Sequence, residues 1–204
     1  MPSAADIVRF ADAPAPPGQT PWVAGAEPLP DIVIAEPNAA WAEAFAVLEG
    51  RIRGALGPTA VSVTHVGSTS VAGLPAKPII DIDLIVADPD DEDAYVPALE
   101  AAGFRLRVRE PWWYGHRCFG ATEPLCNLHV FPPDCPEAAR HLIFRDWLRT
   151  HPEDRERYAD AKRAAAAAAN ERGEHVMQYN ARKQDVVREI YDRAFRGLGL
   201  LPEV

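Results

Sequence analysis

Two aspartates separated by a single residue, Asp81 and Asp83, interrupt the apolar run PIIDIDLIV. On a β-strand, residues two apart point to the same side, so the two carboxylates are expected to lie next to each other. Adjacent carboxylates repel, and burying them without a counter-charge is costly. A divalent cation removes that repulsion, and Mg²⁺ (or Mn²⁺) prefers one or two carboxylates together with phosphate oxygens and water. The pair therefore predicts a metal site, the alternative being two acids that face water at a strand end.

Just before these acids, the stretch HVGSTS forms a turn of small residues. Gly67 permits a close backbone approach, and Ser68, Thr69 and Ser70 provide hydroxyl groups and capping geometry for a helical turn. Backbone N–H groups at the start of such a turn bind anions, although an ordinary capped turn has the same sequence pattern. The spacing to Lys77 differs from that of a Walker A loop. Lys77 could contact a phosphate or form a salt bridge with one of the aspartates.

Strand-like segments dominate the middle of the chain, and helical patterns dominate its end. Apolar and β-branched runs predict strands over residues 31–36, 60–66, 78–86, 104–110, 114–121 and 126–132. Apolar spacings and capping residues predict helices over residues 39–57, 88–104, 137–151, 152–173 and 178–195. The fold class is therefore α+β, a mixed β-sheet flanked by helices, with a helical C-terminal part over residues 136–197.

Length and composition indicate one main domain. The chain has 204 residues, of which 48% are hydrophobic and 25% charged, as in ordinary globular proteins. Residues 1–30 are rich in Pro and Ala, which predicts an extended arm anchored by Trp22, and residues 31–200 are expected to form a single domain. The net charge of -9 argues against a nucleic-acid partner, because such partners require a basic surface. Three cysteines, no secretory signal and no bilayer-spanning run predict a cytoplasmic protein with no membrane partner.

The combination of these features is more specific than any one of them. A strand, a Gly-Ser turn and a strand bearing D-x-D together resemble the active-site motif of the nucleotidyltransferase superfamily, which has a polymerase-β-like fold. HVGSTSVAGLPAKPIIDIDLIV resembles the central motif of the GrpB family within it, and HLIFRDWLRTHPEDRERYADAK resembles that family's second motif. The resemblance covers about residues 31–196. It implies that the turn holds a triphosphate while Asp81 and Asp83 hold Mg²⁺ for attack on the α-phosphorus.

One position departs from the superfamily pattern. The superfamily commonly supplies a third acidic residue from a later strand, whereas the matching strand here presents His129, as GrpB-type sequences tend to do. A neutral imidazole accepts a proton or binds a transition metal, but it is a poor Mg²⁺ ligand. Three interpretations stay open. His129 is the general base for an attacking hydroxyl, amine or carboxylate, or the site binds a nucleotide without transferring it, or His129 only bonds its neighbours.

Further side chains could line the same cleft. Arg145, in the second motif, either pairs with the aspartate that follows it or binds an anion in the cleft. Tyr158 and Lys162 are four residues apart on one predicted helix, and Tyr179 and Lys183 have the same spacing on another. GrpB-type chains generally have Tyr and Lys at equivalent places, which makes Lys183 the next candidate for a phosphate contact.

The remaining histidines and aromatic residues have a structural alternative in each case. His65 could reach the site or make a structural hydrogen bond. His116 and Arg117, beside the aromatic residues Trp112, Trp113 and Tyr114, could form a substrate wall or pack in the core. The sequence predicts no structural zinc site, because the spacing of the candidate ligands fits no common zinc pattern. These ligands are Cys118, Cys126, His116 and His129. The buried stripe of residues 137–151 is expected to comprise Leu142, Phe144, Trp147 and Leu148.

Two functions follow from these features. The first is an enzyme that binds a nucleoside triphosphate with Mg²⁺ and transfers a nucleotidyl group to a small-molecule acceptor, with carboxylate adenylation for amide formation as a variant. The second is a catalytically silent module that binds a nucleotide or phosphorylated metabolite in the same cleft. The residues expected to bind phosphate are Gly67, Ser68, Thr69, Lys77, Arg145 and Lys183. The sequence determines neither the base, the acceptor nor the oligomeric state.

Overall fold

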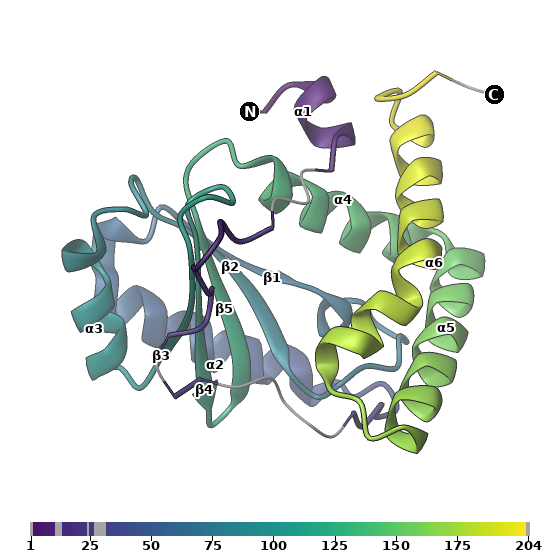
Figure 1. The fold of residues 1–204 in the computed structure, drawn as a ribbon, viewed down its shortest axis with the longest axis horizontal. Coiled ribbons are helices and arrows are strands. Elements are labelled where there is room, and N and C mark those ends of the chain that lie inside the picture. Colours follow the sequence, from purple (N-terminus) through teal and green to yellow (C-terminus); the bar gives the residue numbers. More distant parts are fainter. Residues whose placement is uncertain (1, 11–13, 24, 27–31, 203–204) are drawn as a thin grey trace.

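The centre of the molecule is a five-stranded sheet. The computed structural model describes residues 2–10, 14–23, 25–26 and 32–202. The strands are β1 (Ser62–Val66), β2 (Ile80–Ile85), β3 (Arg105–Glu110), β4 (His116–Thr122) and β5 (Leu125–Phe131). Their order is β1-β2-β5-β4-β3, with β2 and β5 parallel and the other neighbours antiparallel. The sheet is therefore mixed, and the predicted α+β class is confirmed (Figure 1).

One face of this sheet is apolar and is covered by helices α2 (Ala40–Leu56) and α3 (Val96–Ala101). On β2 that face carries Ile80, Ile82 and Leu84, which are buried in the main hydrophobic core. Side chains alternate along a strand, so burial of these three residues turns the intervening aspartates to the opposite face. The apolar pattern of β2 thus fixes the direction of its acidic side chains.

The helical C-terminal part provides the other layer. It consists of α4 (Pro136–Thr150), α5 (Pro152–Glu171) and α6 (Val176–Gly197), with α5 and α6 side by side (Figure 1). Small alanine side chains of α5 let these elements approach closely and share a buried cluster with Tyr179 of α6. Among the described helices, none has the length and apolar character needed to cross a membrane.

Two element predictions need correction. The strand predicted over residues 31–36 is reduced, in its described part, to a single bridge between Ala35 and Ala76. The helix predicted over residues 88–104 is divided into a 3₁₀ turn, Glu92–Ala94, and α3. Pro97 lies in the first turn of α3, where its missing N–H costs nothing, so the proline marks a helix start inside the predicted segment.

The predicted extended arm is partly folded against the domain. Helix α1 (Ala4–Val8) lies against α4, whose buried Arg140 donates hydrogen bonds to the carbonyls of Asp6, Ile7 and Arg9. Trp22 forms an antiparallel bridge with Val108 of β3, which confirms its predicted anchoring role. The arm therefore reaches the edge strand of the sheet and continues the wall of the cavity described next.

Candidate functional site

The polar face of the sheet lines a cavity of about 540 Å³, closed on the other side by residues of α5 and α6. Across the parallel β2–β5 pair, Asp81 is in register with Asn127, and Asp83 is in register with His129. Asp81 lies at the cavity surface, whereas Asp83 lies deeper and is only 3% exposed. The predicted placement of both carboxylates on one strand face is confirmed.

Asp81 is held between a neighbouring strand and the small-residue turn. Its Oδ1 accepts a hydrogen bond of 2.9 Å from Nδ2 of Asn127. Gly67 passes so close that a Cβ atom added there would lie 2.4 Å from Oδ2 of Asp81, and its φ of 66° also favours glycine. The turn can therefore lie against the carboxylate only because residue 67 has no side chain.

Asp83 has a partner that the sequence did not reveal. Nδ1 of His141, on α4, lies 3.0 and 2.9 Å from the two carboxylate oxygens of Asp83. Burial disfavours a charged ring, but the adjacent Asp83 carboxylate and Glu137 raise the pKa of His141 well above its usual value. His141 is thus the counter-charge of the buried carboxylate.

His129 belongs to a chain of hydrogen-bonded groups. Its Nδ1 lies 3.0 Å from Nε2 of His116, and Nδ1 of His116 lies 2.8 Å from Oε2 of Glu110. Burial, reinforced by the neighbouring His116, lowers the pKa of His129 to about 4. The ring is therefore neutral near pH 7, with its orientation fixed from the β3–β4 side of the sheet.

Three lysines line the opposite part of the cavity: Lys77 before β2, Lys162 on α5 and Lys183 on α6. They are the only lysines in the whole sequence, in which the 21 Lys and Arg residues are otherwise all arginine. The ammonium groups stand over two tyrosine rings: Lys77 is 5.4 Å and Lys183 is 5.3 Å from the ring centroid of Tyr179, and Lys162 is 5.1 Å from that of Tyr158. Such rings accept cations while leaving them available to an anion.

Lys162 is the most unusual of the three lysines. It is 2% exposed, and its Nζ donates a hydrogen bond of 2.5 Å to the carbonyl of Pro75. Burial, together with the nearby Lys183, lowers its pKa to about 7. A buried ammonium group with this pKa is poised to become fully charged when an anion enters.

The predicted turn is present as a 3₁₀ segment, Ser68–Ser70. Ser68 lines the cavity, and the Ser70 hydroxyl donates to the carbonyl of Gly67. Thr69 is buried, and its hydroxyl bonds to the Ile79 carbonyl and to Nε2 of His65. Thr69 therefore shapes the turn with its hydroxyl, while Gly67, Ser68 and Thr69 all border the cavity.

Two other predicted residues lie away from the cavity wall. Arg145 donates to the carboxylate of Asp146 and to the carbonyl of His65, which corresponds to the ion-pair alternative rather than to a cleft anion site. The His65 ring stacks on Phe45 of α2, on the apolar side of the sheet. Burial lowers the pKa of His65 to about 4, as expected for a neutral structural histidine.

The hairpin between β3 and β4 was predicted either to form a substrate wall or to pack in the core, and its residues do both. His116 lines the cavity, whereas Arg117 points to the other face and binds Asp90 and Glu92. Trp113 packs edge-on against His116, with ring centroids 5.1 Å apart. The aromatic residues of the hairpin thus support a cavity residue from behind.

Sequence reasoning missed His141 and Glu110 and left Lys162 out of the phosphate set. His141 stands directly before LIFRDWL in the second motif, so its position in a family motif was the available signal. For Lys162 the signal was the scarcity of lysine: all three copies in the chain occupy one cavity. Glu110 lies six residues from its partner His116 across a hairpin, and no local pattern marks that pair.

Known proteins resemble this chain over most of its length. The family model described as "GrpB protein" matches residues 31–193. The UPF0157 protein BH1888 of Halalkalibacterium halodurans is 47% identical over 163 residues, which cover 80% of this chain and 82% of that protein. The UPF0157 protein SCO7215 of Streptomyces coelicolor is 40% identical over 172 residues, covering 84% and 88% of the two chains.

A solved structure supports the same relationship in three dimensions. The crystal structure of the conserved protein GrpB from Enterococcus faecalis superimposes with a TM-score of 0.72 at 27% sequence identity. The match covers 82% of this chain and 99% of the crystallised one. The mixed sheet and its flanking helices are therefore an arrangement shared with that protein.

Proposed function

The chain belongs to the GrpB family, and from that premise we propose that it binds a nucleoside triphosphate with Mg²⁺ (or Mn²⁺) and transfers the nucleotidyl group to a small-molecule acceptor. The observation that carries this proposal is the pairing of opposite charges across one cavity. The Asp81 carboxylate of β2, with the buried Asp83 next to it on the same strand face, shares the cavity with three lysines, which are all the lysines the chain possesses. This is the arrangement that a metal-bound polyphosphate requires.

The donor set on β2 fits a hard divalent cation. Asp81 keeps Oδ2 available because its Oδ1 is bonded to the neutral amide of Asn127. Asp83 is bonded to His141, so a cation at Asp83 would share that carboxylate with a protonated imidazole or displace it. Mg²⁺ bound by these two carboxylates would neutralise phosphate charge and orient the α-phosphate for in-line attack.

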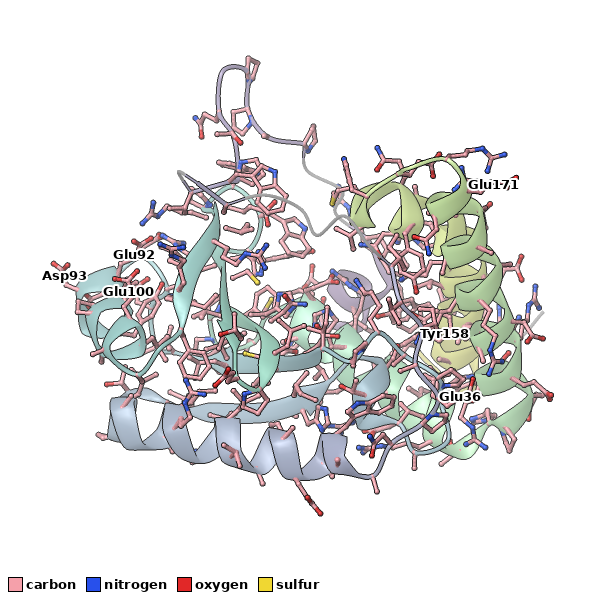
Figure 2. All side chains as sticks on the ribbon, turned by 90° about the horizontal axis from the view of Figure 1, so that it is seen from below. Glu36, Glu92, Asp93, Glu100, Tyr158 and Glu171 are labelled. Carbon is pink, nitrogen blue, oxygen red and sulfur yellow. The ribbon has the colours of Figure 1, made fainter. Side chains whose placement is uncertain are left out.

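The lysines suit the triphosphate tail. Compact ammonium charges at Lys77, Lys162 and Lys183 would neutralise oxygens of the leaving pyrophosphate. The net charge of the chain is negative, but many of its acidic residues lie away from the three lysines. Figure 2 shows Glu92, Asp93 and Glu100 at the α3 end of the molecule and Glu171 at the end of α5. A local cationic wall in an acidic protein draws anionic ligands into the cavity.

The state of His129 favours one class of acceptor. In the transfer step an acceptor oxygen bonds to the α-phosphorus while the bond from the α-phosphorus to the bridging oxygen breaks and pyrophosphate leaves. A hydroxyl acceptor must lose a proton, and a base whose pKa is lowered to about 4 removes it poorly near pH 7. A carboxylate acceptor is already ionised. We therefore favour carboxylate adenylation, in which the neutral His129 positions the acceptor.

A second candidate is a nucleotide- or phosphometabolite-binding module without catalysis. It is favoured by the replacement of the third acidic residue by His129 and by the bond between Asp83 and His141, which satisfies the buried carboxylate without a metal. The same lysines would then hold the phosphate groups of a ligand that is not transformed.

Pyrophosphate release separates the two candidates. The protein is incubated with each nucleoside triphosphate, Mg²⁺ and a set of small carboxylates, alcohols and amines, and hydroxylamine is added to trap an acyl-adenylate as a hydroxamate. We expect pyrophosphate and hydroxamate with the wild type, and at least a 100-fold loss with Asp81→Asn. Asp160→Asn, at an exposed aspartate of α5, is the matched control and should retain activity.

Each contrary result has a distinct meaning. A thermal shift with Mg²⁺ and triphosphate but no pyrophosphate from the wild type would support the silent module and end the enzyme proposal. If Asp81→Asn binds the metal–triphosphate complex as tightly as the wild type does, Asp81 does not hold the metal and the enzyme proposal fails.

A further inference from the structure

Three side chains with soft or borderline metal ligands meet on the β4–β5 side of the cavity. His116, Cys118 and His129 each offer a ring nitrogen or a sulfur, and these atoms all lie within 4.8 Å of one another. Cys118 is directly opposite His129 in the antiparallel pair, and His116 is two residues before Cys118 on the same face of β4. Strand register creates this cluster, and the spacing of these residues along the chain, which matches no common zinc pattern, does not reveal it.

Register also explains why the fourth residue of the rejected zinc set does not take part. Cys126 lies three residues before His129 on β5, and its side chain belongs to the main hydrophobic core on the other face of the sheet. The structure therefore replaces a rejected four-residue structural site with a three-residue cluster that opens on the cavity.

Glu110 prepares His116 as a ligand. Its Oε2 lies 2.8 Å from Nδ1 of His116, so the Nδ1–H group donates a hydrogen bond to the carboxylate, and Nε2 keeps a lone pair. Nε2 is the atom that faces His129, 3.0 Å from Nδ1 of that residue. A carboxylate bonded to the outer nitrogen of a ligating histidine is the usual second partner in protein zinc sites.

The distances are close to those of a tetrahedral ion. Zn–N bonds of about 2.0–2.1 Å and a Zn–S bond of about 2.3 Å place neighbouring ligand atoms roughly 3.3–3.6 Å apart. Nε2 of His116 and Nδ1 of His129 are 3.0 Å apart. One nitrogen of each ring and the Cys118 sulfur all lie within 4.8 Å of one another, so side-chain rotations that draw the sulfur inward complete the geometry. The proton shared between the rings moves to Nε2 of His129, a tautomer change that leaves the imidazole neutral. The Cys118 thiol, which donates to the Phe119 carbonyl, releases its proton to solvent as the metal–sulfur bond forms.

We propose that His116, Cys118 and His129 bind one Zn²⁺-like divalent cation whose fourth coordination position opens on the cavity. Three protein ligands and one open position are typical of catalytic rather than structural zinc. Thiolate and imidazole select a softer ion than the oxygen ligands Asp81 and Asp83, so the two positions hold different ions.

The site is independent of nucleotide transfer but compatible with it. With an ion on its Nδ1, His129 is a ligand rather than a base, which suits an acceptor that brings no proton. The open position would then take an anionic group such as a carboxylate of the molecule in the cavity. Binding of the ion alone is expected whether or not the protein transfers nucleotides.

Cobalt substitution tests the site directly, because Co²⁺ reports its ligands by absorption. The full-length chain is prepared without a metal-binding tag, stripped with chelator and titrated with Co²⁺ in excess Mg²⁺. We expect one Co²⁺ per chain, a thiolate-to-cobalt charge-transfer band, d–d bands of tetrahedral strength, and displacement of Co²⁺ by Zn²⁺ but not by Mg²⁺. A titration without the charge-transfer band would overturn the proposal.

Two variants and a matched control assign the ligands. Cys118→Ser should lose the charge-transfer band, whereas Cys126→Ser, a buried cysteine on the other face, should keep it. Glu110→Gln leaves all three ligands in place and should weaken Co²⁺ binding by about 10- to 100-fold. If Cys118→Ser does not fold, Glu110→Gln decides: an unchanged Co²⁺ affinity, or loss of the band in Cys126→Ser, rules the site out.

Discussion

The two walls of the cavity hold their polar groups in different ways. On the sheet wall each functional group is fixed by another side chain: Asp81 by Asn127, Asp83 by His141, and His129 by His116. On the helical wall the lysines meet tyrosine rings, a tyrosine hydroxyl and a backbone carbonyl. The sheet wall is therefore built to keep atoms in place, and the helical wall is built to offer positive charge.

This difference has a physical origin. Strand register sets the distance between groups on neighbouring strands, so a carboxylate or imidazole on the sheet has little freedom to move. Lysines at the ends of long flexible stems can adapt to phosphate groups in several positions. We therefore expect changes on the sheet wall to alter metal binding and stability, and changes on the helical wall to alter affinity for the polyphosphate tail.

The effect that distinguishes the walls most directly is expected from Lys183→Met. Loss of this charge should weaken ATP binding by about 10- to 100-fold, because a charge-assisted phosphate contact contributes about 1.5–3 kcal/mol, and should weaken AMP binding much less. Calorimetric titration with ATP, ADP and AMP measures the dependence on tail length. An equal loss for all three ligands would show that Lys183 contacts the nucleoside or holds the fold.

Chemical labelling provides the control for that experiment. Because all three lysines of the chain line the cavity, the amines that an amine-selective reagent can modify are these lysines and the N-terminus. Protection of Lys77 and Lys183 by ATP with Mg²⁺, read by mass spectrometry, would place the phosphates there. Full reactivity in the presence of saturating ATP would contradict the assignment.

The next effect concerns the buried pair formed by Asp83 of the sheet wall and His141 of α4. His141→Gln removes the counter-charge of Asp83 and should lower the free energy of unfolding by about 3 kcal/mol at pH 6, since breaking a buried ion pair leaves one charge unpaired. The folded-state pKa of His141 is raised, so its stabilisation is fully present below its unfolded pKa of about 6.5 and is lost as pH rises through the folded value.

Denaturant unfolding from pH 6 to pH 10 checks this sign. The difference between wild type and His141→Gln should be largest at pH 6 and should shrink as the solution becomes alkaline. His175→Asn is the matched control, because it removes a histidine at the start of α6 while asparagine still caps that helix. A difference that stays constant with pH would mean that His141 is neutral in the folded protein.

The same contrast explains how much of the site the sequence could predict. Alternation along β2 is a local property, so the shared face of Asp81 and Asp83 was predictable from two residues and a strand period. The bond between Asp83 and His141 spans 58 positions and depends on how α4 crosses the sheet. The predicted buried stripe of α4 includes Leu142, which is 36% exposed, and omits Arg140, which is buried. The helix therefore turns a different face to the sheet from the one its apolar spacing predicts.

The effect that tests the helical wall without a ligand is the pH dependence of Lys162→Met. Burial lowers the folded-state pKa of Lys162 to about 7, whereas the unfolded value is that of a free lysine, 10.5. Between these values the unfolded chain binds more protons, so this lysine makes stability rise with pH, by up to about 1.4 kcal/mol per pH unit. This is opposite in sign to the contribution of His141, and only the variants separate the two.

Lys162→Met should remove that rise. The unfolding free energy of the wild type should therefore increase relative to that of the variant as the pH rises from 7 to 10. Lys77→Met, which leaves Lys162 in place, serves as the comparison. Parallel pH curves for wild type and Lys162→Met would mean that Lys162 is charged in the empty cavity at neutral pH. The helical wall would then be fully cationic before any anion arrives, and its charge would be as fixed as that of the sheet wall.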